Sequence, residues 1–513
     1  MAFSYDIPTM KKSYITLCAA ALLALGGCEK DLIQAPISGG STPTFYQSAA
    51  DFDQALTATY SGLLPYPDRL LNLSEIRSDN IYGVGEAGVR DWEPVNNFFN
   101  TLATNPFIAE AWNANYNGIF RANTVLDQLA TNGGVLTDAV RLRTEGEAKF
   151  LRAFYYFDLV RYFGRVPLLE NALVPNEVLT VPRSPVADVY NLIIADLQTA
   201  IANLPTNYDN TVSSDRANIG RATGSAAKGL LALVYLTRSG PTYGIQGPGL
   251  ATNDYAKALP LLNEIIASGK YALLPKYSDI FSYTNENNRE VLFDVQYISG
   301  GTGRGATYPG LMVPTTYFAA VKVPFAGAEE IKPVSNDLFN SYAAGDVRKA
   351  FNFQTSFTSL TGFLETRPFE RKYVNETLRG IDRFDWPINF IVLRYTDVLM
   401  MKAECILNGG GGSQTEVDDI VNQVRARAGL PAVTGVTLPQ LLEERRREFA
   451  AEGLRWHDLV REGVVLTVMN AWIPKDDIRN KITRNITANN IIYPVPQAEI
   501  TSSAGLYDQN PGY

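Results

Sequence analysis

Histidine and cysteine are almost absent from this chain of 513 residues, which has one histidine and three cysteines. A Ser-His-Asp triad, a Cys-His pair or a His-rich metal site would each have to use His457. That histidine follows Trp456 in a helical pattern, where a packed side chain is expected. Cys405 is the single cysteine after residue 28 and lies in an apolar helical pattern, which indicates a core residue. We therefore expect no disulfide, metal site or cofactor built on these side chains.

A net positive charge and long apolar runs are also lacking. The formal net charge is −8. Nucleic-acid binding depends on clustered Lys and Arg, and this balance argues against it. No apolar run after the N-terminal region reaches the roughly 18 residues of a transmembrane helix. The sequence therefore predicts a chain that does not span a membrane.

Two segments resemble catalytic motifs only superficially. Residues 301–306 (GTGRGA) partly match a dinucleotide-binding fingerprint, but that fingerprint must open a helix, and Pro309 and Gly310 follow at once. Residues 443–448 (EERRRE) have the spacing of ion pairs along one helix. Among 53 Asp and Glu residues, none is marked out as the carboxylate pair of a glycoside hydrolase, so this enzyme class stays open as an alternative.

The N-terminal region has the pattern of a lipoprotein signal. Two lysines precede an apolar stretch at 14–25, as in a signal peptide. At about 1.5 Å per residue, a helix of that length is too short to cross a membrane. Two glycines then lead into Cys28, which resembles the bacterial lipobox, whose cysteine is acylated after cleavage. We predict a signal peptide over 1–27 and a lipid such as palmitate on Cys28.

The segment that follows the predicted lipid site is a candidate tether. Residues 28–43 are small and polar, contain no aromatic side chain and end in Gly, Ser, Thr and Pro, a composition typical of flexible linkers. Met10 stands directly before the two lysines of the signal. It is therefore an alternative start of the protein.

Helical periodicity dominates the remaining sequence. Apolar residues recur every three or four positions, most clearly over 148–162, and Gly164 and Pro167 then provide the usual helix-stop chemistry. Further helices are expected to begin near 185 and within 223–269, and to cover 394–407, 416–428 and 438–451. The two helices within 223–269 have small residues where they would cross. They fit either a tetratricopeptide-like pair or an ordinary helical hairpin.

The later part of the chain changes character. Residues 291–297 alternate like a short strand, and the segment from there to about 387 is irregular and rich in Gly, Pro, Thr and Tyr. The tail over 493–513 is expected to be extended. Loops on a helical scaffold commonly carry function. We therefore predict a mainly α fold with an irregular, loop-rich region that contains short strands.

Several blocks resemble the signatures of the SusD/RagB family. The most specific is residues 146–168, GEAKFLRAFYYFDLVRYFGRVPL. The other blocks follow in family order at 74–80 (SEIRSDN), 394–404 (RYTDVLMMKAE), 424–430 (VRARAGL), 444–449 (ERRREF), 452–456 (EGLRW), 493–496 (YPVP) and 509–513 (QNPGY). One departure is His457, where the family usually has an aromatic residue. That difference affects only local packing.

The resemblance implies a SusD-like α-helical lipoprotein of the outer membrane that captures a nutrient at the cell surface and caps a SusC-like TonB-dependent transporter. The segment 29–31 (EKD) is similar to the short acidic signal that exports such lipoproteins. We expect an N-terminal helical part over 44–270, with tetratricopeptide-like pairs, and a C-terminal part over 271–513 in the same globule. Ion pairs between helices are expected from Arg152, Asp158, Arg161, Arg394, Asp397 and Glu404.

Binding is expected in the aromatic loops, because sugar rings stack on flat side chains while Asn, Asp and Arg bind their hydroxyl groups. The candidate ligand-binding residues are Arg77, Asp91, Trp92, Asn96, Asn97, Tyr297, Tyr308, Tyr317 and Trp386. No catalytic residue, metal ligand or cofactor is predicted.

The expected function is non-catalytic capture of an oligosaccharide and its delivery to the transporter. Three alternatives stay open: a peptide-binding member of the same family, a surface glycoside hydrolase, and a structural lid with no affinity of its own. The sequence does not identify the ligand, because the loops that set specificity carry no transferable motif.

Overall fold

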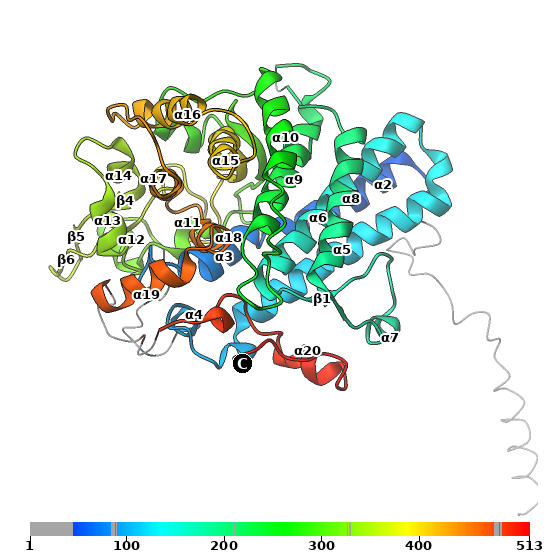
Figure 1. The fold of residues 1–513 in the computed structure, drawn as a ribbon, viewed down its shortest axis with the longest axis horizontal. Coiled ribbons are helices and arrows are strands. Elements are labelled where there is room, and N and C mark those ends of the chain that lie inside the picture. Colours follow the sequence, from blue (N-terminus) through cyan, green and yellow to red (C-terminus); the bar gives the residue numbers. More distant parts are fainter. Residues whose placement is uncertain are drawn as a thin grey trace, which may run out of the picture.

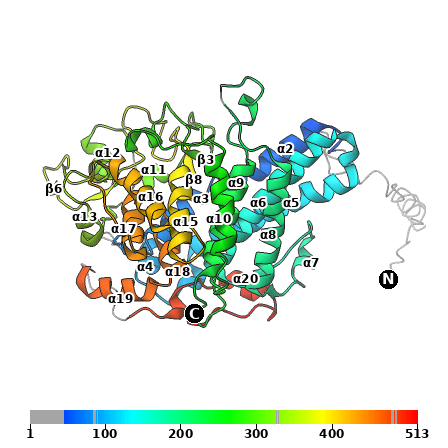
Figure 2. The ribbon, with the colours of Figure 1, turned by 45° about the horizontal axis from the view of Figure 1, so that its top comes forward.

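The structure is a computed structural model that describes residues 45–513, except 84–87, 89, 210, 326, 328–329, 477–481 and 483–484. The predicted signal peptide (1–27), Cys28 and the predicted tether (28–43) lie outside the described residues. The fold is mainly helical, as predicted, with small two-stranded sheets (Figures 1 and 2). In the described part of the chain, no helix is long and apolar enough to cross a membrane.

The N-terminal half is an array of long helices that pack on one another in chain order (Figure 1). Caps fix their ends. In α6, the Thr137 side chain accepts a hydrogen bond from the Val140 N–H, and Gly164, with a φ of +66°, ends the helix. The elements are α2 (Ala49–Tyr60), α3 (Tyr66–Leu70), the π-helical turn η3 (Leu71–Glu75), α4 (Trp92–Asn96), α5 (Pro106–Asn132), α6 (Asp138–Phe163), β1 (Val166–Pro167), α7 (Pro175–Val178), β2 (Arg183–Ser184), α8 (Val186–Asn203), α9 (Gly224–Ser239) and α10 (Tyr255–Ala267).

The C-terminal half combines short elements with a second group of helices. β3 (Val291–Val295) pairs antiparallel with β8 (Phe390–Arg394), and the loop-rich region lies between them in sequence. That region contains α11 (Tyr308–Leu311), α12 (Thr315–Ala320), α13 (Asn336–Ser341), α14 (Val347–Asn352), β4 (Phe353–Gln354), β5 (Phe357–Thr358), β6 (Leu364–Glu365) and β7 (Phe369–Glu370). The helices that follow are α15 (Tyr395–Leu407), α16 (Gln414–Arg427), α17 (Leu438–Glu448), α18 (Arg455–Arg461), α19 (Val465–Asp476) and α20 (Gln497–Ser502).

The C-terminal tail is not extended throughout, so that prediction was wrong. Residues 497–502 form α20, which follows Pro496 and carries Glu499 in its first turn. A proline directly before a helix and an acidic side chain near its N-terminus both favour helix formation. The surrounding prolines and glycines had indicated extended chain.

One apolar core crosses both halves, and α6 contributes a fully buried stretch over 150–163. Charged side chains inside it are paired between helices. Arg152 of α6 binds Asp196 of α8 with a nitrogen–oxygen distance of 2.7 Å, and Arg445 of α17 binds Asp397 of α15 at 2.5 Å. Asp158 binds Arg69 of α3, Glu404 binds Arg461 of α18, and Arg394 at the end of β8 binds Glu448 of α17. Arg161 pairs with Asp158 of its own helix. The predicted ion pairs between elements are therefore confirmed except for that of Arg161, and they hold the scaffold that presents the loops.

Candidate ligand-binding face

Two loops of the C-terminal half are joined by a single carboxylate. Asp385 accepts hydrogen bonds from the backbone N–H groups of Gly300, Gly301 and Ile381 at 3.0, 3.1 and 3.2 Å. Burial alone would raise the pKa of Asp385, but these N–H groups hold it below its ordinary value. Beneath the loops, Ala306 and Trp386 form a backbone bridge. The loops at 298–306 and 380–386 are therefore held in one fixed arrangement.

The glycine motif at 301–306 shapes this loop and does not itself open a helix, as expected. Gly301 and Gly303 both have a φ of +72°, a backbone region that other residues adopt at a cost. The reason expected was wrong, because Pro309 and Gly310 do not prevent a helix and lie in the single turn of α11, which begins at Tyr308.

Trp92 lies at the start of α4 and is half-buried. The Lys332 ammonium group lies over its ring, 4.1 Å from the ring centre, and donates to the Leu311 carbonyl at 2.6 Å. Beside it, Arg90 binds the Glu330 carboxylate at 2.5 Å. These contacts join α4 to residues 330–332 and to α11.

The exposed side of these loops offers one further aromatic ring. Phe384 is 43% exposed, and the Arg383 guanidinium lies 4.3 Å from its centre. Arg383 also packs closely on Gly310 of α11, the helix whose Leu311 carbonyl accepts from Lys332. We call residues 90–92, 297–306, 330–332 and 378–386, whose segments are linked through Gly310 and Leu311 of α11, the loop face. Its partly or largely exposed rings are those of Trp92, Tyr297 and Phe384, and it also carries Arg, Lys, Glu and Asp side chains.

Six of the predicted ligand residues are buried, so their side chains support the fold around the loop face. Arg77 lies between the rings of Phe98 and Tyr493 and donates to two backbone carbonyls. The Asn96 side-chain amide donates to the Ile76 and Ile81 carbonyls, and the Tyr308 hydroxyl donates to those of Ile388 and Asn389. The Trp386 indole N–H donates to the Arg383 carbonyl, and the Tyr317 hydroxyl donates to the Glu376 carboxylate. Asn97 is also buried. As folded, these six side chains leave little surface for a ligand.

The other three predicted residues are accessible. Asp91 is exposed at the start of α4, and Trp92 and Tyr297 are half-buried. The Tyr297 hydroxyl donates to the Leu64 carbonyl at 2.6 Å, which fixes its ring at the edge of the loop face. Sequence reasoning missed Arg90, Lys332 and Phe384. Phe384 lies two positions before Trp386, so the same aromatic pattern could have indicated it. Lys332 lies far from Trp92 in sequence, and no local pattern indicates their contact.

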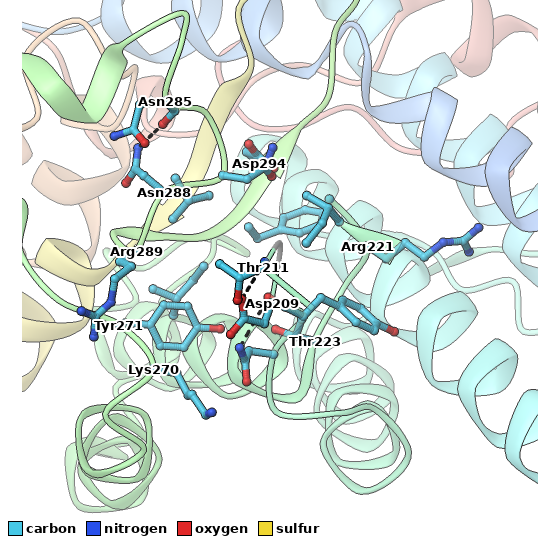
Figure 3. A pocket seen from close by; sticks show the side chains of 18 of the residues that line it. Asp209, Thr211, Arg221, Thr223, Lys270, Tyr271, Asn285, Asn288, Arg289 and Asp294 are labelled. Carbon is cyan, nitrogen blue, oxygen red and sulfur yellow. Dashed lines mark hydrogen bonds between the residues drawn. The ribbon is translucent and has the colours of Figure 1, made fainter. Parts of the chain in front are cut away.

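A separate cavity of about 580 Å³ lies on another part of the molecule, between residues 207–223, 269–274 and 285–294 (Figure 3). Figure 3 shows Tyr271 pointing toward Asp209 and Thr223. Asp209 accepts hydrogen bonds from the Thr211 hydroxyl and from the Thr211 backbone N–H, and these two bonds hold the pKa of Asp209 below its ordinary value. Asp294 is buried at the opposite wall, and burial raises its pKa to about 7. Within the cavity, Asn288 donates to the Asn285 carbonyl and Arg289 to that of Gly269.

The residues that could have carried catalysis are packed side chains. His457 is buried against Tyr162, and burial together with Arg161 and Arg461 holds its pKa well below the ordinary value. Cys405 is buried, which raises the pKa of its thiol. Among the described residues, no group of three or more His, Cys, Asp or Glu side chains could hold a metal ion.

Comparisons with known proteins point to one family. Residues 340–513 match the model of the SusD family, and residues 41–236 match the model described as "Starch-binding associating with outer membrane". A SusD-like protein P2 of Formosa agariphila is 28% identical over 98% of this chain and 100% of its own length. The starch-binding protein SusD of Bacteroides thetaiotaomicron is 26% identical over 77% of this chain and 76% of its own length.

A solved structure has the same fold. The surface glycan-binding protein A of Bacteroides thetaiotaomicron, in complex with laminarihexaose, has a TM-score of 0.76 and is 25% identical. The match covers 90% of this chain and 99% of that one.

Proposed function

This chain belongs to the SusD family, and from that membership we propose that it is a non-catalytic binding lipoprotein of the outer membrane that captures a glycan at the cell surface and delivers it to a SusC-like TonB-dependent transporter. The relatives named above include a starch-binding protein and a protein that binds laminarihexaose. We propose a ligand of the same class, a neutral oligosaccharide. Lipidation of Cys28 would keep the protein at the membrane.

The observation that carries the proposal is the setting of Trp92. Lys332 covers one face of its ring, and the indole is accessible beside the charged pair Arg90 and Glu330. A flat ring bordered by charged hydrogen-bonding groups suits a sugar, because its C–H face packs on the ring while its hydroxyls bind the polar groups. We propose that Trp92, Tyr297 and Asp91 contact the ligand, together with Arg90 and Phe384.

Two carboxylates of the loop face are held by other groups. Glycoside hydrolysis needs two carboxyl groups free to act as acid and as base or nucleophile. Glu330 is bound by Arg90, and Asp385 is bound by three backbone N–H groups. Neither of these two is available for proton transfer in this arrangement, whereas Asp91 and Asp382 are exposed, so the assay for new reducing ends decides between binding and hydrolysis.

For the transporter contact we propose the hairpin formed by β5 and β6. Leu360 is 75% exposed and Phe363 63% exposed, and Leu364 of β6 is exposed beside them. A cluster of exposed apolar side chains on one projecting hairpin is typical of a protein contact surface. The proposed partner is the SusC-like barrel.

The experiment is isothermal titration of the purified protein with laminarihexaose, maltohexaose and a mixed peptide pool, followed by an assay for new reducing ends. We expect saturable binding of at least one hexasaccharide and no new reducing ends. Saturable peptide binding without a glycan response would show that the ligand is a peptide and not an oligosaccharide. Turnover that disappears with one carboxylate variant would overturn the non-catalytic assignment.

A further inference from the structure

A second recess lies along α5 and shares no lining residue with the loop face. It has a volume of about 440 Å³ and is enclosed by α5, residues 167–178 and the tail segment 499–507. We call it the α5 groove. In Figure 1, α7 and α20, which border the groove, lie on the lower right, whereas α12, α13 and β6 of the loop-rich region lie on the left. Its volume falls within the range of roughly 300–1,000 Å³ that is usual for small-ligand pockets.

Aromatic rings line the groove along one face of α5. Trp112, Tyr116 and Phe120 follow one another at four-residue spacing, so they share a helix face. Trp112 at the bottom is 3% exposed, whereas Phe120 at the rim is 51% exposed. The Tyr116 hydroxyl donates to the Pro167 carbonyl at 2.8 Å, which fixes that ring. The floor is therefore rigid, and its outer part presents ring surface to solvent.

Polar groups of the groove are unused by the protein. Asn113 and Asn117 are exposed beside the aromatic series, and Glu499 faces it from α20. Within the described chain, neither of these two side-chain amides nor the Glu499 carboxylate makes a hydrogen bond or ion pair. By contrast, Asn123 deeper in the groove binds two backbone carbonyls and Arg152. The Asn123 amide is therefore occupied by contacts within the protein, whereas the amides of Asn113 and Asn117 at the rim are available to a ligand.

The lining also limits the class of ligand. It includes no Lys, Arg or His among the described residues, so nothing compensates the charge of a phosphate or carboxylate. A second anion beside the partly buried Glu499 carboxylate would be repelled by its charge, so an anionic ligand is unfavourable there. Apolar ring faces bordered by amide donors and one acceptor fit a neutral polyhydroxylated ring, which presents both C–H and O–H groups.

We infer that the α5 groove is a second saccharide site, which binds an uncharged hexopyranose unit against Tyr116 and Phe120 and bonds its hydroxyls to Asn113, Asn117 and Glu499. The class of ligand rests on the proposed function, whereas the place of the site rests on the groove itself. A long glycan held at both sites would dissociate more slowly than a short one, because release from one site leaves it bound at the other.

The test compares laminarihexaose and maltohexaose binding to the full protein and to three variants. Phe120→Ala and the double variant Asn113→Ala with Asn117→Ala alter the groove, and Trp92→Ala alters the loop face. Val347→Ala is the control, since Val347 of α14 is 50% exposed and lies in neither site. The readouts are isothermal titration and hydrogen exchange of the peptides that cover α5 and residues 499–507.

We expect two binding phases in the unaltered protein. The groove variants weaken one phase roughly tenfold, as expected for the loss of a stacking contact, and leave the Trp92 phase unchanged. Ligand slows exchange in residues 499–507 in the Trp92→Ala variant as well. If Trp92→Ala abolishes all binding and the groove variants behave like Val347→Ala, only this inference is overturned. If neither hexasaccharide binds the unaltered protein, both this inference and the glycan part of the proposed function are overturned.

Discussion

The ammonium group of Lys332 lies 4.1 Å from the centre of the Trp92 ring, although 240 positions separate the two residues in the chain. The contact covers one face of the indole and fixes its orientation through the Lys332 bond to the Leu311 carbonyl. A cation over an aromatic face stabilises the pair by about 0.5–1 kcal/mol at a partly exposed site. A ligand can therefore stack on this ring without first ordering it, which reduces the entropy lost on binding.

Replacing Trp92 tests the loop face. We expect Trp92→Ala to lower glycan affinity about tenfold or more, since the stacking surface is lost, and Trp92→Phe to retain part of it. Thermal unfolding of both variants should stay close to that of the unaltered protein, because Trp92 is only half-buried. Titration with the hexasaccharide that binds gives the affinities. Equal glycan affinity in the Trp92→Ala and Val347→Ala variants would show that Trp92 does not contact the ligand.

Glu75 of η3 and Glu370 of β7 are both buried, and the pKa of Glu370 responds to the Glu75 carboxylate, which gives a prediction on stability and pH. Burial, and then the neighbouring Glu75 carboxylate, raises the pKa of Glu370 well above its ordinary value of 4.5. The folded state therefore retains a proton that the unfolded state releases near pH 4.5. Stability from this group is fully present below that pH and falls as the pH rises toward the folded-state pKa.

Glu370→Gln removes this dependence, because an amide stays neutral. We expect the variant to gain stability over the unaltered protein as the pH rises from 5 to 8, by at most about 1.4 kcal/mol per pH unit. Urea unfolding at four pH values measures the difference. Glu264→Gln, at an exposed ion pair with Lys228, is the control and should give a nearly constant difference. A constant difference for Glu370→Gln as well would contradict a proton held at this pair.

Arg394 is the centre of a buried ionic network. Its guanidinium lies 3.2 Å from the Glu290 carboxylate, 2.9 Å from that of Glu448 and 2.8 Å from that of Glu452. Arg394→Met would leave these carboxylates buried with fewer partners, which destabilises the fold by about 3–5 kcal/mol. Lys402→Met, which breaks the partly exposed pair with Glu416, should cost less than about 1 kcal/mol. Denaturant unfolding of both variants makes the comparison, and similar losses would show that the network adds little.

The helices were predictable because their signals are local. The sequence prediction placed helices at 394–407 and 416–428, and the structure has α15 over Tyr395–Leu407 and α16 over Gln414–Arg427. The strand predicted at 291–297 is β3. Apolar spacing and end-capping residues act within one or two turns, so a single sequence reports them. The division at residue 270 stays a prediction, since one apolar core includes residues of both parts.

The loop face was harder to predict, because its contacts join distant segments. Arg77 has the composition expected of a sugar site, an arginine near aromatic residues. In the structure its guanidinium lies 4.1 Å from the Phe98 ring and 4.7 Å from the Tyr493 ring, inside the core. The same residue types serve both roles, and burial decides between them. Burial depends on partners such as Tyr493, far along the chain, which no local pattern reports.

The hairpin of β5 and β6 gives a prediction on the partner. Leu360→Asp with Phe363→Ser would place polar groups on the exposed apolar surface. Because both side chains project into solvent, we expect unchanged thermal unfolding and unchanged glycan affinity, but loss of co-purification with the transporter. Leu142→Asp, at an exposed position of α6, is the control for an added charge. If the hairpin variant co-purifies as well as the unaltered protein, the transporter contacts another surface.

If Cys28 carries the lipid, replacing this cysteine abolishes membrane attachment and leaves folding unchanged. Each methylene of a buried acyl chain contributes about 0.8 kcal/mol to membrane binding, and stable anchoring takes more than one chain. Among the residues that the structure describes, no helix is long and apolar enough to cross a membrane. Cys28→Ala should therefore leave a folded protein that binds glycan but appears in the soluble fraction. Cys18→Ala, in the apolar stretch of the predicted signal, is the matched control and should remain in the membrane fraction. Because the two variants differ only in the position of the lost thiol, retention of Cys28→Ala in the membrane would place the attachment elsewhere in the chain.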